Sequence, residues 1–351
     1  MRRKTLVIVC LLVIGLMVAS AVPIGAKKPP SPPDDGGGDA TGTIYYLMKD
    51  NAGDITFWNM DADGGNKAEF TDSWPGSLSL NQHDGSYWFV YFEELTTTHY
   101  GDIYQTELWA VRADGTGDPI DLWDDPSMVY IDGWNGDICW MTDDAYISWV
   151  TWKLDENGDI YDPGIYTASM SWGDDDDTPE LGTPEKVHDL GTYDYDTGDV
   201  RAAGCSPIWS PDGALLLYWS YDTGRMLVDF SDPDDPDYPK ETSFGYNGEA
   251  AFSPDGTRIA VTVDSESLVV MDIDGSNEKT IASVKSTKYL WRNLQFIHWS
   301  PDSAYITYGS LTINWPDMDC DVYIIGADGS GRTALTRTTT TCDWYVPLEW
   351  R

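Results

Sequence analysis

Three oxygen-bearing side chains alternate in the segment DENGDIYD (155–162), and their types would suit a calcium ion. Asp155, Asn157 and Asp159 stand two residues apart, the spacing at which calcium loops present carboxylate and amide oxygens. Gly158, however, comes two positions too early for an EF-hand loop. The segment also fits a hairpin turn between the strands ISWVTWKL and IYTASMSW. We favour the turn and keep calcium as the alternative; no other cofactor is expected.

The other side chains that commonly do chemistry form no recognised catalytic or zinc motif. The four histidines include no H-x-x-x-H pair, and the sequence has no C-x-x-C, so zinc is not expected. A G-x-S-x-G nucleophile elbow is also missing from the sequence. The 59 Asp and Glu residues make any single pair of carboxylates a poor indicator of acid–base catalysis.

The N-terminus has the pattern of an export signal. Basic residues at 2–4 precede an apolar run over residues 6–22, and small residues suited to signal peptidase end at Ala26. We predict a signal peptide over 1–26, with an uncleaved membrane anchor as the alternative because the apolar run approaches a bilayer-spanning length. Residues 27–42 form a Pro/Gly-rich tether. Either alternative predicts an extracellular or cell-surface protein.

The composition is strongly acidic, with a formal net charge of −38 over 351 residues. Nucleic acid is not expected as a partner, because binding it requires basic patches that displace counterions. For the same reason, membrane contact is expected only through an uncleaved N-terminal anchor. Adaptation to a salty medium, calcium sites or a cationic partner would each account for so much acid, and we favour a solvated acidic surface.

A short aromatic-Ser-Pro-Asp motif recurs along the chain and indicates a repeat. WSPDG begins at Trp209, FSPDG at Phe252 and WSPDS at Trp299, and Trp350 falls in the same register. Two weaker copies lie upstream, around residues 134 and 81, which makes six. A period of 40–50 residues is typical of propellers and other arrays.

Each copy contains enough strands for one propeller blade. A second turn follows the motif at intervals, as in VRADGTG (111–117), MDIDGSN (271–277) and GADGSG (326–331), and each turn comes after alternating apolar residues. Asp-Gly between alternating segments is a strong hairpin signal. The unit therefore has about four antiparallel strands, which is typical of a β-propeller blade.

The two ends of the chain supply complementary parts of one blade. The final segment, WYVPLEWR, provides only a first strand, whereas residues 43–71 provide only the later strands. Pairing these segments would remove an open sheet edge. The sequence thus predicts an all-β, six-bladed propeller over 43–351, whose ring is closed by pairing of the N- and C-terminal strands.

The repeat resembles that of the TolB-like β-propeller family. The resemblance covers roughly residues 43–351 and is clear over 205–335 but degenerate over 72–200. It implies that Ser-Pro-Asp-Gly is a structural turn, in which Asp212, Asp255 and Asp302 tie strand ends together. We expect a solitary propeller, without the α/β domains that accompany the repeat in TolB and in peptidase relatives.

A propeller fold predicts where a ligand would be met. The first strand of each blade lines the central channel, so residues shortly before the recurring aromatic are best placed to contact a ligand. The channel-mouth candidates are Asp132, Arg201, Glu249, Arg292, Asn293 and Asp343.

The blade order also predicts a disulfide bond. Cys320 begins the third strand of a blade and Cys342 follows its fourth, so both would lie at the same end of that blade. An exported chain permits such a bond, and Cys139 and Cys205 would pair by elimination.

These observations favour a binding or scaffolding function. We expect an exported, monomeric propeller that binds a protein or a cell-surface glycan and has no catalytic residues. The alternative is a propeller enzyme acting on polysaccharide or peptide, with Glu249 and Asp343 as general acid and base, which would require two carboxylates roughly 5–9.5 Å apart in the channel.

Overall fold

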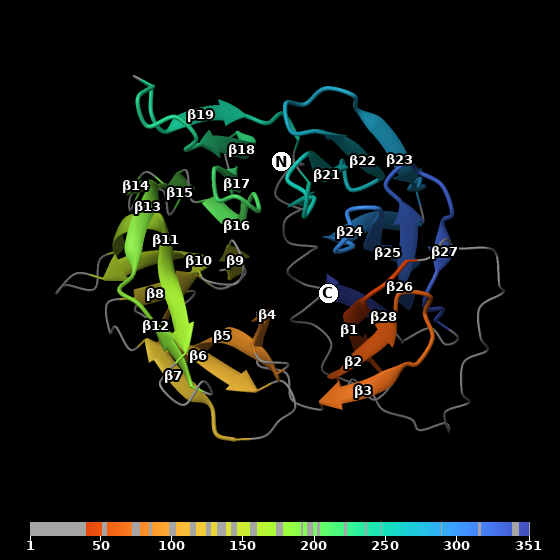
Figure 1. Ribbon diagram of the computed structural model, residues 1–351, viewed down its shortest axis with the longest axis horizontal. Helices are drawn as coiled ribbons and strands as arrows, with labels where there is room; N and C mark the ends of the chain where they lie inside the picture. Colours follow the sequence, from red (N-terminus) through yellow and green to blue (C-terminus); the bar gives the residue numbers. More distant parts are fainter. Residues whose placement is uncertain are drawn as a thin grey trace.

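The regular secondary-structure elements in the described part of the chain are all β-strands, arranged around a common centre (Figure 1). The computed structural model describes residues 40–350 except for 51–54, 72–77, 84–85, 98–102, 113–116, 124–127, 132–137, 142–145, 155–159, 173–177, 191, 195–198, 202–203, 221–222, 236, 247, 289, 315–316 and 339–343. No helix long and apolar enough to cross a membrane occurs among these residues.

Two sheets are regular four-stranded antiparallel blades, and both come from the region where the repeat is clearest. One contains β16 (Gly204–Trp209), β17 (Leu215–Ser220), β18 (Gly224–Asp229) and β19 (Lys240–Ser243). The other contains β20 (Ala250–Phe252), β21 (Arg258–Val263), β22 (Ser267–Asp272) and β23 (Lys279–Ser283). The central strands β21 and β22 are buried over four consecutive residues, which explains their continuous apolar sequence. All four residues of the outer strand β19 are polar and exposed.

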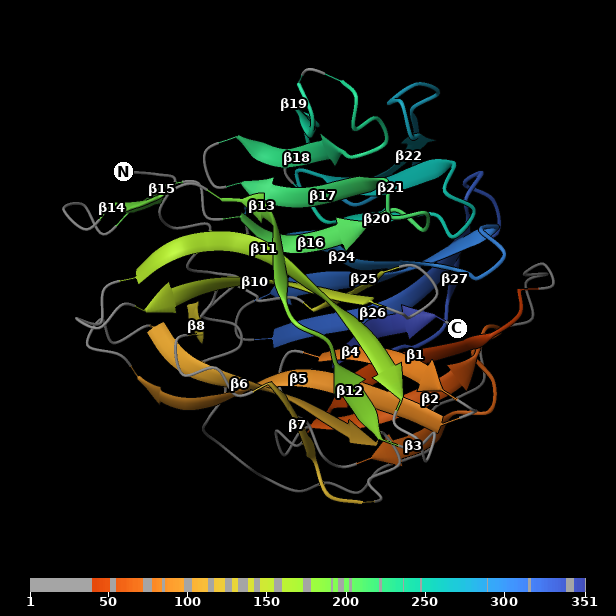
Figure 2. The same cartoon turned by 60° about the vertical axis from the view of Figure 1, so that its left-hand side comes forward.

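An eight-stranded sheet combines the two ends of the chain. Its first group is β24 (Trp291–Trp299), β25 (Tyr305–Asn314), β26 (Asp317–Gly326) and β27 (Thr333–Ala334), and its second is β28 (Trp344–Trp350), β1 (Thr43–Lys49), β2 (Ile55–Asp61) and β3 (Ala68–Thr71). β1 pairs antiparallel with β28 from Ile44↔Trp350 to Lys49↔Trp344. Strands from the two ends of the chain therefore share one sheet, as Figure 2 also shows.

The region of weak repeats forms a ten-stranded sheet and a separate hairpin. The sheet contains β4 (Leu78–His83), β5 (Ser86–Thr97), β6 (Ile103–Arg112), β7 (Ile120–Trp123), β8 (Met128–Ile131), β9 (Cys139–Met141), β10 (Tyr146–Leu154), β11 (Ile160–Trp172), β12 (Pro179–Leu181) and β13 (Glu185–Asp189). The hairpin contains β14 (Thr192–Asp194) and β15 (Asp199–Arg201).

The prediction of a propeller with four-stranded antiparallel blades is confirmed, but the strands form five sheets and not six separate blades. Three additional pairings join neighbouring groups of strands. β26 is ten residues long and meets β28 in parallel at Cys320↔Trp344, and β8 pairs with both β6 and β10. The strand lengths and the short β8 could not be read from the repeat spacing.

The hydrophobic core lies mainly between neighbouring blades. One cluster joins Ala260 and Leu268 of the β20–β23 blade to Ile306 and Tyr308 of the next blade, and all four side chains are fully buried. Another joins Leu217 of the β16–β19 blade to Phe252 and Ile259. Each blade thus buries its apolar faces against its neighbours, which is the main source of stability in such an arrangement.

The Ser-Pro-Asp turns have one geometry in all three copies. The carboxylate of Asp212 accepts hydrogen bonds from Ser210 Oγ at 2.6 Å and from Ala214 N at 3.1 Å. Asp255 accepts the equivalent bonds from Ser253 Oγ and Thr257 N, and Asp302 those from Ser300 Oγ and Ala304 N. Each serine hydroxyl also accepts a bond from the backbone N–H that begins the next strand. The Asp side chain therefore organises the turn between the first and second strands of a blade.

The third turn departs from the motif, with Ser303 in place of glycine. Ser303 takes the left-handed conformation, φ 58°, which Gly213 and Gly256 occupy in the other copies. Its hydroxyl accepts a bond from Asp255 N at 3.0 Å, and its carbonyl accepts one from Arg258 Nη2 at 2.5 Å. Serine at this turn thus links two blades, a contact that glycine cannot make through a side chain.

The turn predicts a pH-dependent contribution from Asp212. Hydrogen bonds from Ser210 and Ala214 hold the pKa of this carboxyl below its usual value. A lowered pKa stabilises the fold above the unfolded-state pKa, and this contribution is lost as the pH falls through the folded-state pKa. We expect Asp212→Asn to lower the free energy of unfolding by about 1 kcal/mol at pH 7 and by less at pH 3. Urea unfolding at both pH values measures this, and an equal loss at both would contradict it.

Candidate functional site

The structure describes four of the six predicted channel-mouth residues, three of them at the starts of two neighbouring blades. Glu249 directly precedes β20, while Arg292 and Asn293 lie near the start of β24 in the next blade. Arg201 belongs to the separate β14–β15 hairpin, opposite Thr192, and not to the inner strand that begins at Gly204. Asp132 and Asp343 lie outside the described residues.

Glu249 makes a structural contact with the neighbouring blade. Its Oε2 accepts a hydrogen bond from the backbone N–H of Phe296, and Thr262 bonds both its N–H and its carbonyl at 2.9 Å. Phe296 lies where the β24–β25 register shifts and has a φ of 58°, an unfavourable conformation for an aromatic residue. The carboxylate thus supports a strained bulge, a role that the motif spacing did not reveal.

This contact predicts different effects for two substitutions of Glu249. Glu249→Ala leaves the Phe296 N–H without its acceptor and should lower the free energy of unfolding by about 1–3 kcal/mol. Glu249→Gln keeps an acceptor oxygen and should cost less than about 1 kcal/mol. Urea unfolding of both variants tests this; a Gln variant as unstable as the Ala variant would show that the negative charge itself is required.

The segment that leads into β24 presents a basic and aromatic surface. Trp291 is 39% exposed and Arg292 is exposed beside it. Ser286 Oγ accepts a bond from Arg292 N and donates one to Arg292 O, both at 3.1 Å. Ser286 N also donates to Glu266 Oε1 at 3.1 Å, and Thr287 N to Leu290 O at 2.7 Å. These bonds hold described residues on both sides of residue 289, and we call the segment 284–292 the β24 entry loop.

A stretch of sequence without acidic residues could have predicted this basic surface. Residues 279–301 contain no Asp or Glu, although the chain has 59, and they contain Lys279, Lys285, Lys288 and Arg292. The charge of Lys285 contributes to lowering the pKa of Glu266, behind the hydrogen bonds that Ser286 supplies. The entry loop is therefore a local basic region on an acidic molecule.

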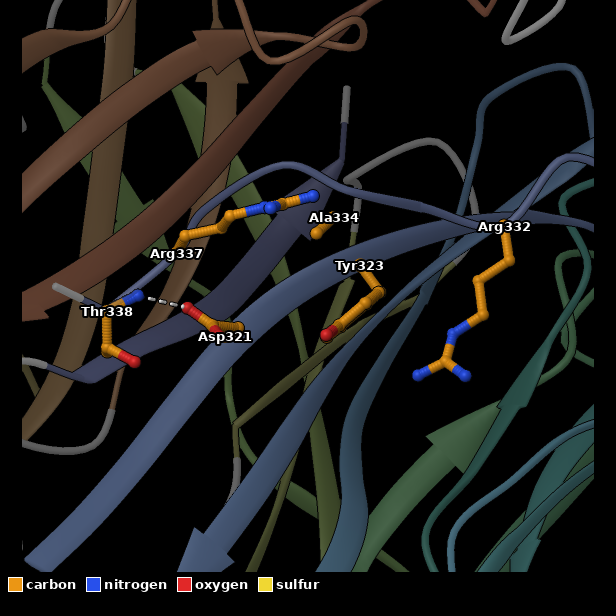
Figure 3. Close-up of a pocket in the computed structure, with 6 residues that line it drawn as sticks. All are labelled: Asp321, Tyr323, Arg332, Ala334, Arg337 and Thr338. Carbon is orange, nitrogen blue, oxygen red and sulfur yellow. Dashed lines mark hydrogen bonds between the residues drawn. The ribbon is translucent and has the colours of Figure 1, made fainter. Parts of the chain in front are cut away.

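A second feature is a hollow of about 520 Å³ beside β26, which we call the β26 hollow (Figure 3). It is lined by Asp321, Tyr323, Arg332, Ala334, Arg337 and Thr338. The guanidinium carbon of Arg332 lies 4.5 Å from the centroid of the Tyr323 ring and 5.9 Å from that of Tyr308. The two tyrosine rings stack at 5.6 Å, so Arg332 rests on a fixed aromatic pair.

Asp321 is the acidic residue of the hollow. Burial raises the pKa of its carboxyl, and hydrogen bonds from Thr338 N at 2.7 Å and Thr336 Oγ1 at 3.4 Å partly oppose this, as does the charge of Arg337. Nearby, Lys67 Nζ donates to the carbonyl of Leu335 at 2.6 Å. Burial lowers the pKa of Lys67, and the charge of Asp321 acts in the opposite direction. None of the hollow-lining residues was among the predicted site residues.

The metal and disulfide predictions fall mostly outside the described residues. Asp155, Asn157 and Asp159 are not described, and the described residues contain no group of three or more metal-ligating side chains. Cys320 is a buried thiol and is not disulfide-bonded in the structure, while its predicted partner Cys342 is not described. Burial raises the pKa of Cys320, and the charges of Asp321 and Glu249 add to this. Both the Cys320–Cys342 and the Cys139–Cys205 bonds stay predictions.

Comparisons with known proteins show that the fold is similar to that of TolB. No protein-family model matches the sequence. Over 108 residues, 27% of the chain, it is 35% identical to the Tol-Pal system protein TolB of Anaeromyxobacter dehalogenans (strain 2CP-C), and this match spans 24% of that protein's length. The structure of TolB from Acinetobacter baumannii is similar with a TM-score of 0.55 at 15% identity, covering 89% of this chain and 68% of that one.

A second solved structure is similar at a lower score. The periplasmic gluconolactonase of Pseudomonas aeruginosa matches with a TM-score of 0.45 at 13% identity, covering 84% of this chain and 83% of that one.

Proposed function

We propose that this chain, whose fold and partial sequence are similar to those of TolB, is an exported binding propeller that holds a protein partner at its channel mouth in the cell envelope. The observation that carries the proposal is the β24 entry loop. Trp291 and Arg292 are exposed there, and two hydrogen bonds with Ser286 hold the Arg292 backbone. Tryptophan and arginine are the residue types most enriched at the energetic centres of protein interfaces.

The local charge also favours docking at the entry loop. Residues 279–301 are free of acid in a chain of net charge −38, so an acidic segment of a partner would be attracted here, whereas most of the surface would repel it. Such complementarity fixes the orientation of a partner and favours one docking site over others. A cell-surface glycan is the second ligand class that an exposed tryptophan fits, through stacking on a sugar ring.

The proposal includes the location and the architecture. Residues 1–26 act as a signal peptide or anchor, and the 27–42 tether carries the propeller at the cell surface or in the envelope. The body is a monomeric propeller, in which strands from the two ends of the chain pair as β1 with β28. The acidic surface is solvated, with calcium at 155–159 as the alternative.

The competing function is a propeller enzyme that uses channel-facing carboxylates. Glu249 is the described candidate for that role, and its Oε2 is engaged by the Phe296 N–H. This engagement supports a structural role for the carboxylate. If Glu249→Gln abolished hydrolysis of a polysaccharide or peptide substrate while unfolding normally, the enzyme function would replace the binding function.

The binding function can be tested by capture from an envelope extract. We would immobilise the full chain and three variants, then cross-link and identify bound proteins from a detergent extract of the cell envelope. Trp291→Ala and Arg292→Ala should each lower recovery of a specific partner at least about tenfold, equivalent to about 1.4 kcal/mol.

The matched control for the tryptophan is Tyr238→Ala, which removes another exposed aromatic side chain, 45% exposed and outside the loop. It should leave recovery unchanged. Equal recovery by all variants, or equal loss in the Tyr238 variant, would contradict docking at the entry loop.

A further inference from the structure

The β26 hollow lies apart from the channel mouth, at the other side of its blade. β24, which carries the entry loop, is one edge strand of the β24–β27 group, and the hollow is lined from β26 and from the segment that includes β27 at the opposite edge. Its volume of about 520 Å³ falls within the range of small-molecule sites, roughly 300–1,000 Å³.

The hollow concentrates positive charge. Residues 329–342 contain no Asp or Glu and supply both Arg332 and Arg337. Arg332 is held over the Tyr323 and Tyr308 rings, so its guanidinium loses little further freedom when it binds a ligand. Arginine presents several N–H donors in a planar fork that matches a carboxylate. Two arginines beside one hollow of an acidic chain therefore fit an anionic group.

Asp321 adds a second requirement for the ligand. Its Oδ1 accepts the bonds from Thr338 N and Thr336 Oγ1, and no described residue donates to its Oδ2. A ligand that offers a hydroxyl or ammonium donor to this oxygen would satisfy it, whereas one without a donor would leave a partly buried carboxylate oxygen unpaired. Sites of this kind discriminate strongly against ligands that lack the donor.

We propose that the β26 hollow binds a small organic acid, whose carboxylate is held by Arg332 and Arg337 and whose adjacent hydroxyl or ammonium group donates to Asp321. The shared chemistry is a carboxylate next to a hydrogen-bond donor, and the source is a sugar acid or an amino acid. This site is independent of partner docking at the entry loop.

Isothermal titration of the full chain tests the ligand class with four probes at equal ionic strength. Glucuronate and glutamate carry both groups, propionate carries only the carboxylate, and glucose carries only hydroxyls. We expect one of the first two to bind at least about tenfold more tightly than propionate and glucose. The tighter of the two identifies the source. Glucose binding as tightly as the acids, or no saturable binding of either acid, would overturn the proposal.

Variants locate the site. Arg337→Ala should weaken binding of the acid at least about tenfold, and Asp321→Asn should reduce the preference for that acid over propionate. Arg292→Ala removes the same charge from the exposed entry loop and should change nothing. Equal weakening by Arg337→Ala and Arg292→Ala would mean that net charge alone governs binding, and would overturn the site. The entry-loop variants test partner docking, and the hollow variants test binding of the organic acid. Failure of one proposal would therefore leave the other standing.

Discussion

Replacing Gly248 by alanine is expected to lower the free energy of unfolding by about 3 kcal/mol. A Cβ atom at this position would lie 1.9 Å from the carbonyl oxygen of Thr262 and 2.1 Å from its Oγ1, so the backbone itself would have to move. Gly248 also accepts a hydrogen bond from Arg225 Nε through its carbonyl, at 2.8 Å. Any shift would be passed to the next residue, Glu249, and through it to the Phe296 bulge.

A matched glycine separates steric overlap from the general cost of losing glycine. Gly245 has a φ of 79°, and a Cβ there would meet no atom within 4 Å. Gly245→Ala should therefore cost only the strain of the left-handed conformation, about 1 kcal/mol. Chemical unfolding of both variants gives the comparison, and a Gly248 variant no less stable than the Gly245 variant would refute the close approach to Thr262.

Replacing Trp299 by alanine is expected to cost about 3–5 kcal/mol. The side chain is 5% exposed and packs in the cluster between the β20–β23 and β24–β27 groups. Its Nε1 donates to the carbonyl of Ala251 at 3.0 Å, and the guanidinium carbon of Arg258 lies 4.9 Å from the centroid of its ring. Truncation would leave a cavity and an unpaired carbonyl at the junction of two blades.

Trp299→Phe should recover most of this loss, because it keeps an aromatic ring for Arg258 and lacks only the indole N–H and part of the volume. We expect a residual cost of about 1–2 kcal/mol. Thermal unfolding followed by near-ultraviolet circular dichroism measures both variants. If Phe and Ala were equally destabilising, the hydrogen bond to Ala251 and not packing would dominate at this position.

The recurring motif predicted the parts of the fold that depend on local chemistry. Asp212, Asp255 and Asp302 each bond the turn that contains them, and such contacts within a few residues follow from the residue types alone. The division of the strands into five sheets could not be predicted from the motif. It depends on the pairing of the long strand β26 with β28 at Cys320↔Trp344 and on the pairings of the short strand β8, which are contacts between segments distant in sequence.

The site was less predictable because its residues act through contacts between blades. Spacing placed Glu249 and Arg292 near the start of an inner strand, where they lie, but gave no indication that Glu249 bonds Phe296. Arg201 lies in the β14–β15 hairpin, which precedes the strand beginning at Gly204 and which the repeat spacing did not predict. The basic character of residues 279–301 and 329–342 could have been read from the sequence by mapping where acid is missing.

Hydrogen–deuterium exchange of the full chain, alone and with the captured envelope partner, tests the binding function most directly. We expect slower exchange of backbone amides across residues 284–292 when the partner is bound, with little change in β18 and β19. Slower exchange in β18 and β19 with no change across 284–292 would contradict docking at the channel mouth.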